Sequence, residues 1–189
     1  MPRPILIFVR FVDRLNYGVG RFAMYLLYVL MAILLWSSMS KIIQAPAIWT
    51  LEMAQFMMVA YYILGGPYSM QLGSHVRMDL VYDALSDRRR LWWDAFTIFV
   101  LIFYLCVMLY GAVQSTAYSF GLKYYAVEIS WLPFDIPWGK TGFMERNPSA
   151  WRPYLWPIKL VMVLGFFLMI LQSLSFFFRD IAALRGVKI

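Results

Sequence analysis

Hydrophobic residues gather into four long runs, and the segments between these runs hold most of the charge. The runs cover residues 22–43, 48–70, 91–120 and 155–178. A helix needs about 20 predominantly apolar residues to cross the roughly 30 Å hydrocarbon layer of a membrane. Each run therefore predicts a transmembrane helix, and the 189 residues predict a single membrane domain.

Two shorter segments have helical periodicity but are too short to span a membrane. In residues 4–17 and again in residues 76–86, apolar side chains recur at helical spacing, while Arg and Asp fall on other faces. Amphipathic helices of this kind lie flat in the membrane interface. The pattern thus predicts an all-α membrane protein with four transmembrane helices plus short interfacial helices.

The first run also has to be distinguished from a signal peptide, because arginines precede it and small residues end it. An apolar signal region holds about 7–15 residues, and residues 22–40 exceed that length. We therefore expect a first transmembrane helix. The first and fourth runs present the longest uninterrupted apolar surfaces.

The distribution of Lys and Arg predicts the orientation of the chain. These residues are most frequent before the first run, between the second and third, and after the fourth. Cytoplasmic segments of membrane proteins carry an excess of Lys and Arg. Both termini are therefore expected in the cytoplasm, and residues 121–154 are expected to form the long outer loop.

Composition excludes several other classes of protein. Hydrophobic residues make up 62% of the chain and charged residues 14%, against about 25% charged residues in soluble domains. The formal charge of +7 is spread between apolar runs, so we assign it to topology and membrane lipid and expect no nucleic-acid binding. One histidine, His75, and one cysteine, Cys106, cannot build a bis-histidine haem, zinc or iron–sulfur site. We expect neither an enzyme nor a cofactor.

Three charged residues fall close to the outer ends of the predicted spans: Lys41, Glu52 and Lys159. A charge inside hydrocarbon costs at least about 2.5 kcal/mol at the membrane centre, so such residues are usually paired or functional. We expect Glu52 to pair with Lys41 or Lys159. A cation-coupling role for Glu52 is the alternative.

The outer loop combines prolines with large aromatic residues. Prolines fix the backbone and aromatic rings bury a large area, so the loop is either an ordered lid over the outer surface or part of an interfacial aromatic belt. The candidate contact residues in and next to the loop are Trp131, Pro133, Trp138, Trp151 and Trp156.

One short motif adds a family resemblance. Directly after the second run, the chain has the sequence GSHVRMDL, in which Gly73, His75, Val76, Arg77 and Asp79 match the pattern G-x-H-V-R-x-D. This resembles the small permease subunits of TRAP transporters, the DctQ family. A W-P-x-K sequence beginning at Trp156 and the acidic Glu52 early in the second run are similar to the same family. The resemblance covers about residues 20–180.

The resemblance implies a small accessory subunit in a tripartite, sodium-coupled transporter of organic acids such as dicarboxylates. Its partners would be a large permease subunit, which holds the substrate and sodium sites, and a periplasmic substrate-binding protein. The chain would lie in the bacterial inner membrane, scaffold the large subunit and help to dock the binding protein. Two alternatives stay open: a haem-free membrane anchor of a respiratory enzyme, and a self-contained homo-oligomeric transporter.

Overall fold

The computed structural model of the chain describes residues 3–72, 87–129, 132–140 and 143–184. These residues form four long helices and a two-stranded sheet. In chain order the elements are α1 (Arg3–Ile42), α2 (Thr50–Gln71), α4 (Asp87–Ser119), β1 (Leu122–Ile129), β2 (Leu132–Lys140) and α5 (Trp156–Leu184). Helices α2, α4 and α5 begin and end within a few residues of the predicted runs.

Three of the described helices are long and apolar enough to cross a membrane, over Ile5–Ile42, Phe96–Ser119 and Trp156–Ala182. This confirms a predominantly helical membrane protein with several spans. Helix α2 is not one of these three helices, and Glu52 and Gln55 interrupt its apolar sequence. Its 22 residues would still extend about 33 Å at 1.5 Å per residue, so the fourth span stays a prediction.

Helix α1 corrects the prediction of a separate interfacial helix over residues 4–17. Arg3–Ile42 is one continuous helix of 40 residues, about 60 Å long at 1.5 Å per residue. The charges in its first half do not break the helix, because arginine is a good helix former; Asp13 in this half pairs with Arg179 of α5. The other predicted interfacial helix, residues 76–86, lies outside the described residues.

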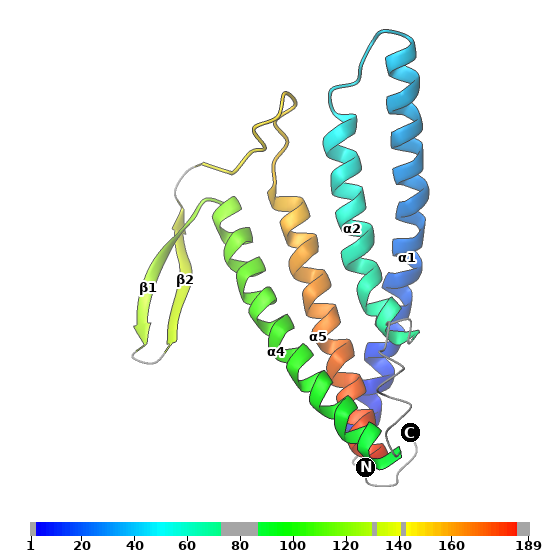
Figure 1. Cartoon of the computed structure of the whole chain (residues 1–189). Helices are drawn as coiled ribbons and strands as arrows, with labels where there is room; N and C mark the ends of the chain where they lie inside the picture. Colours follow the sequence, from blue (N-terminus) through cyan, green and yellow to red (C-terminus); the bar gives the residue numbers. More distant parts are fainter. Residues whose placement is uncertain (1–2, 73–86, 130–131, 141–142, 185–189) are drawn as a thin grey trace.

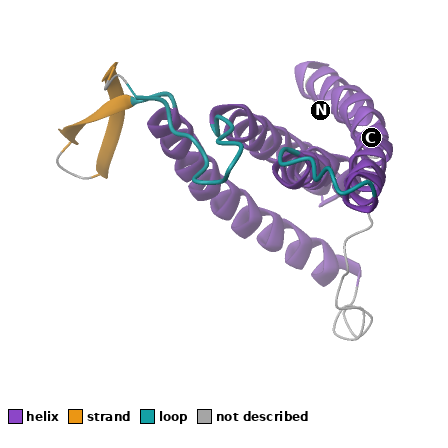
Figure 2. Ribbon diagram, turned by 90° about the horizontal axis from the view of Figure 1, so that it is seen from above, coloured by secondary structure: helices purple, strands orange, loops and turns teal. Residues whose placement is uncertain are grey.

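The helices form an open row. Helix α5 lies between α2 and α4, and α1 packs along α2 and also meets α5 (Figure 1). Helix α4 packs on α5 and has no comparable contact with α1 or α2 in the described part of the chain. Seen from above, the row does not close into a ring (Figure 2).

The two ends of this row differ. The start of α1, the end of α2 and the end of α5 lie together at one end, which we call the terminal end (Figure 1). The opposite end, where α1 connects to α2 and α4 connects to α5, is the loop end.

Glycines set the closest helix contacts. A Cβ on Gly165 of α5 would lie 2.0 Å from Cγ2 of Ile63 in α2, and a Cβ on Gly20 of α1 would lie 2.3 Å from Cβ of Tyr68 in α2. Small residues let helix backbones approach closely in membranes, where packing rather than hydrophobicity drives association. Both glycines therefore hold α2 against its neighbours.

The chain is predominantly helical as predicted, but it also has a β-hairpin between α4 and α5 that was not predicted. Strand β1 pairs with β2 in antiparallel register from Leu122↔Lys140 to Ile129↔Leu132. The hairpin lies beside α4 rather than over the helix ends (Figures 1 and 2), so it is not the expected lid. The prolines of β2 fit this arrangement, because proline is tolerated on edge strands.

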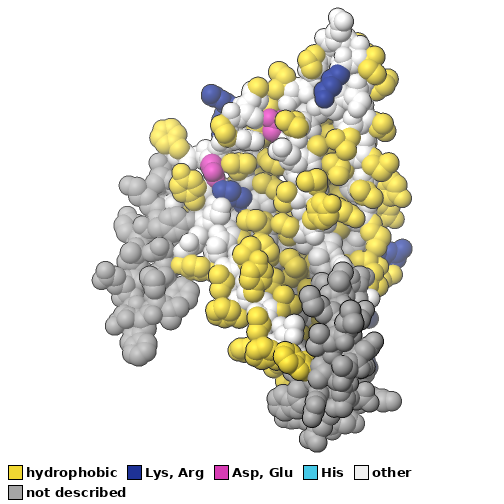
Figure 3. Space-filling model, in the orientation of Figure 1, with side chains coloured by type: hydrophobic (Ala, Val, Ile, Leu, Met, Phe, Trp, Pro, Cys, Tyr) yellow, Lys and Arg dark blue, Asp and Glu magenta, His cyan; other side chains and the backbone are white. Residues whose placement is uncertain are grey.

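The outward faces of α1 and α4 carry the most exposed apolar surface. Only 11% of the most apolar window is buried in each of these helices, against 33% in α5. The first run therefore behaves as expected, but the second exposed surface belongs to the third run and not to the fourth, which is packed between two neighbours. Figure 3 shows hydrophobic side chains over most of one face of the row.

Candidate functional site

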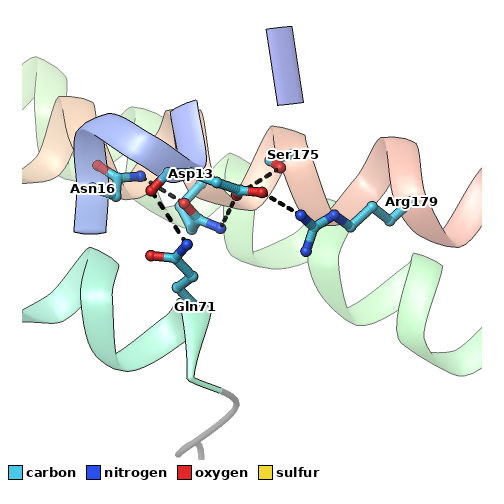
Figure 4. A network of polar contacts seen from close by, with 6 residues as sticks. Asp13, Asn16, Gln71, Ser175 and Arg179 are labelled. Carbon is cyan, nitrogen blue, oxygen red and sulfur yellow. Dashed lines mark hydrogen bonds and ion pairs between the residues drawn. The ribbon is translucent and has the colours of Figure 1, made fainter. Parts of the chain in front are cut away.

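A partly buried polar cluster joins three helices at the terminal end (Figure 4). We call it the Asp13 cluster, and its members come from α1, α2 and α5: Asp13, Asn16, Gln71, Gln172, Ser175 and Arg179. On α5, positions 172, 175 and 179 follow i, i+3, i+7 spacing, which places them on one face. On α1, positions 13 and 16 are also three apart.

Asp13 is the centre of the cluster. Its Oδ1 accepts hydrogen bonds from Gln172 Nε2 at 3.1 Å and from Ser175 Oγ at 3.4 Å, and its Oδ2 pairs with the guanidinium of Arg179. Its backbone carbonyl accepts a bond from Gln71 Nε2 at 3.2 Å. The Asp13 carboxylate therefore connects α1 to α5, and the Asp13 backbone carbonyl connects α1 to α2.

The pair of Asn16 and Gln172 extends the cluster toward the middle of the helices. Asn16 Nδ2 donates to Gln172 Oε1 at 2.6 Å, and both side chains are fully buried. Two amide oxygens, Asn16 Oδ1 and Gln71 Oε1, are buried without a hydrogen-bond partner among the described residues. An unsatisfied buried acceptor costs about 1–3 kcal/mol. The hydrogen bonds that the Asn16 and Gln71 amides donate across the helices offset this cost.

The chemistry of the Asp13 cluster is structural. The negative charge of Asp13 is balanced by Arg179, and each bond crosses between helices rather than pointing at open space. Hydrogen bonds between membrane helices contribute about 0.6 kcal/mol each on average. The cluster therefore fixes the register of α1, α2 and α5.

A second cluster lies at the loop end. We call it the Glu145 cluster: Lys159 Nζ of α5 lies 2.5 Å from Glu145 Oε2, and Ser119 Oγ at the end of α4 donates to the same oxygen. Burial would raise the pKa of Glu145, but the hydrogen bonds from Lys159 and Ser119 and the positive charge of Lys159 outweigh it. The pKa of Glu145 therefore lies below its ordinary value.

The segment after the hairpin is held against the helix ends through this cluster. The backbone N–H of Glu145 donates to the carbonyl of Ser119, and the N–H of Leu155 donates to the carbonyl of Glu145. Within the segment, Arg146 lies 4.4 Å from the ring centre of Tyr154 and donates to its hydroxyl. Residues 143–155 are therefore an anchored loop.

The structure does not bring Lys41, Glu52 and Lys159 together as predicted. Lys159 pairs with Glu145, a loop residue that the sequence analysis did not single out. Lys41 is exposed in the last turn of α1. Glu52 is only 4% exposed, and its Oε2 is buried without a hydrogen-bond partner in the described part of the chain.

The predicted contact residues of the outer loop are spread out. Trp156 begins α5 and stacks on Phe120 at 5.5 Å between ring centres, and Trp151 is exposed in the anchored loop. Pro133 and Trp138 belong to β2. Trp131 lies outside the described residues, as do all the motif positions: Gly73, His75, Val76, Arg77 and Asp79.

The sequence analysis missed the Asp13 cluster, although a signal for it exists. Gln172, Ser175 and Arg179 form a polar stripe on one face of a mostly apolar helix. Such a stripe in a membrane helix indicates interhelical hydrogen bonds. Its partners on α1, more than 150 residues earlier, have no comparable local signal.

Comparison with known proteins decides the family. The model of the family described as tripartite ATP-independent periplasmic transporters, DctQ component, matches residues 30–183. This chain belongs to the DctQ family. No curated protein sequence matches it.

DctQ proteins are the small permease components of TRAP transporters, so the chain is a transporter component. TRAP systems are tripartite and combine this component with a large permease and a binding protein. The apolar helices of the chain agree with a multi-pass protein of the inner membrane.

Proposed function

We propose that this DctQ subunit is a scaffold for the large permease of a sodium-coupled organic-acid uptake system and helps to dock the binding protein. The observation that carries the proposal is the exposed apolar surface of α1 and α4. In this proposal α2 is the fourth span, both termini are cytoplasmic, and the loop end faces the periplasm.

Each of the two exposed faces follows helical spacing. On α4, large apolar residues recur at i, i+3, i+7 and i+11, and on α1 aromatic and aliphatic residues repeat along the outward side. All are more than half exposed: Phe96, Phe99, Phe103 and Val107 on α4, and Tyr25, Tyr28, Leu35 and Trp36 on α1. Lipid can cover such faces, but an open row also offers them to a larger membrane protein.

The polar groups support a scaffold role. The acidic groups of the two clusters are paired within the chain, Asp13 with Arg179 and Glu145 with Lys159. Groups paired in this way stabilise helix contacts instead of binding a solute. We therefore assign the substrate and sodium sites to the large permease.

The anchored loop supports the docking role. Phe143, Met144 and Trp151 are 89%, 53% and 42% exposed in this loop, although the loop backbone is tied to α4 and α5. An exposed aromatic residue on a fixed backbone loses little conformational freedom when a partner covers it. These residues form the proposed contact with the binding protein.

The deciding experiment is affinity purification of the tagged chain from mild detergent, with mass spectrometry of the proteins that come with it. We expect a large multi-span permease. Alanine pairs then locate the interface: Phe99→Ala with Phe103→Ala on α4, against Tyr25→Ala with Tyr28→Ala on α1. Recovery of the chain alone as a stable oligomer would contradict the scaffold proposal and favour a self-contained transporter.

The coupling and docking proposals need the reconstituted complex. Uptake of an organic acid into liposomes should require sodium, and Phe143→Ala with Trp151→Ala should weaken binding of the periplasmic protein without loss of the permease. Trp93→Ala, at the opposite end of α4, is the matched aromatic control. Equal loss in both variants would contradict docking at the loop end.

A further inference from the structure

The first half of α1 carries a stripe of arginines. Arg10, Arg14 and Arg21 are four and seven residues apart, and at 3.6 residues per turn they lie within about 40° of one another around the helix axis. All three side chains are exposed. We call this set the arginine stripe.

The arginine stripe is not neutralised within the described chain. Neither Arg10 nor Arg14 has an ion pair or hydrogen bond to another described residue, and Arg21 only lies over the ring of Tyr17, at 5.7 Å. The acidic residue of this segment, Asp13, is occupied by Arg179 of α5. Three positive charges therefore face outward from one helix.

The position of the stripe relative to the membrane span is defined by charge. No charged residue occurs in residues 22–40, a stretch about 28 Å long at 1.5 Å per residue and close to the thickness of the hydrocarbon layer. Arg21 therefore lies at the edge of that layer. Measured from Arg21 toward the N-terminus, Arg14 and Arg10 lie about 10 and 16 Å along the helix axis. If the helix is tilted by about 40°, the upper end of the usual range, these residues lie about 8 and 13 Å from Arg21 along the membrane normal.

Apolar side chains accompany the stripe. Ile7, Phe11 and Phe22 are 69%, 62% and 60% exposed along the neighbouring side of α1. A helix side that combines cations with exposed large apolar residues suits the boundary between headgroups and acyl chains. An acidic protein surface would satisfy the arginines but would leave these apolar residues without an apolar partner.

We propose that the arginine stripe binds the headgroups of anionic phospholipids in the leaflet on the N-terminal side of the membrane. The guanidinium groups bind phosphate, and arginine does so in a bidentate manner. Ile7 and Phe11 contact the upper parts of the acyl chains. The proposal concerns the membrane around this chain and does not depend on the transported substrate.

The test is a lipid titration of the purified full-length chain in mild detergent, read by native mass spectrometry, with phosphatidylglycerol and phosphatidylcholine titrated separately. Wild-type protein should retain phosphatidylglycerol more tightly than phosphatidylcholine. The triple variant Arg10→Gln, Arg14→Gln, Arg21→Gln should lose affinity for phosphatidylglycerol by on the order of fivefold per arginine, with little change for phosphatidylcholine.

Two further variants keep the result interpretable. Conversion of the same three residues to Lys keeps the charge and should retain most of the preference. Conversion of Lys41, Arg146 and Arg152 to Gln removes three exposed positive charges at the loop end and should leave this preference largely intact. Circular dichroism and the unfolding temperature establish that each variant is folded.

Two outcomes would overturn the proposal. The first is an unchanged lipid preference in the folded Gln variant. The second is an equal loss of preference in the loop-end control, which would show a nonspecific effect of net charge. If the first outcome came with loss of a co-purifying protein, the stripe would be assigned to an acidic protein partner instead.

Discussion

Replacement of Gly165 by alanine tests the packing of α5 on α2. The new Cβ would lie 2.0 Å from Cγ2 of Ile63, 3.1 Å from its carbonyl oxygen and 3.3 Å from its carbonyl carbon. Isoleucine is stiff at χ1 because it is β-branched, and the two other contacts are backbone atoms. Side-chain rotation alone cannot relieve the overlap, so the helices must separate.

The magnitude follows from two opposing effects. Overpacking of this kind costs about 1–3 kcal/mol, while alanine improves helix propensity over glycine by about 0.8–1.0 kcal/mol. Gly65 of α2 is the matched control, because a Cβ there would meet nothing within 4 Å. Gly65→Ala should be neutral or stabilising, and Gly165→Ala should be less stable than this control by about 1–3 kcal/mol.

The assay is thermal unfolding of the purified chain in one detergent, followed by circular dichroism. A double-mutant cycle with Ile63→Ala isolates the contact, because removal of Cγ2 should rescue most of the defect of Gly165→Ala. If Gly165→Ala unfolded at the same temperature as Gly65→Ala, or if Ile63→Ala gave no rescue, the close approach of α2 and α5 would be wrong.

Three carboxylates give further predictions for the same unfolding assay. Asp13→Asn should destabilise the chain by about 2–3 kcal/mol, because it removes the charge that balances Arg179; stability equal to wild type would show that the Asp13 cluster does not hold the helices. Glu145→Gln should lower the free energy of unfolding by about 1 kcal/mol at neutral pH. Because the pKa of Glu145 is lowered in the folded state, the ionised carboxylate stabilises the wild-type fold above the ordinary glutamate pKa of about 4.3. Wild type should lose this stabilisation as the pH falls through that value and below it, whereas the Gln variant should not. A steady difference between the two proteins down to pH 3 would argue against the ion pair with Lys159. Glu52→Gln should unfold at the same or a higher temperature, because the buried carboxylate oxygen has no described partner; a clearly lower temperature would indicate a missed ion pair.

The sequence predicted the helices well where apolar runs are uninterrupted. Helices α4 and α5 coincide with such runs, and α2 begins within a few residues of Pro46 as expected. The start of α1 was misjudged because charged residues there were taken to separate an interfacial helix from a span. The backbone continues through them as one helix, since arginine side chains favour helix and do not interrupt it.

The pairing of charges could not be predicted from local patterns. Lys159 was expected to pair with Glu52 on the basis of depth alone, but Glu145 reaches it because the loop folds back on the ends of α4 and α5. The hairpin was missed for a different reason. Strand β1 contains Tyr124, Tyr125 and Val127, residues that favour strands, yet the prolines and aromatic residues of this segment were interpreted as an ordered lid or an interfacial aromatic belt.

The open row of helices has a consequence for how the sequence can vary. In a closed bundle, many side chains pack into a central core that limits which residues are allowed. An open row of helices has little such core, so more side chains lie on its two outer faces. Substitutions should therefore be tolerated on the outward faces of α1 and α4 in the isolated chain, and be restricted along the seams where α1 meets α2, α2 meets α5 and α4 meets α5. A mutational scan performed twice, once for folding and once for transport, would separate constraints from helix packing from constraints imposed by a partner. Positions that are sensitive only in the transport scan would mark the surface that the partner contacts.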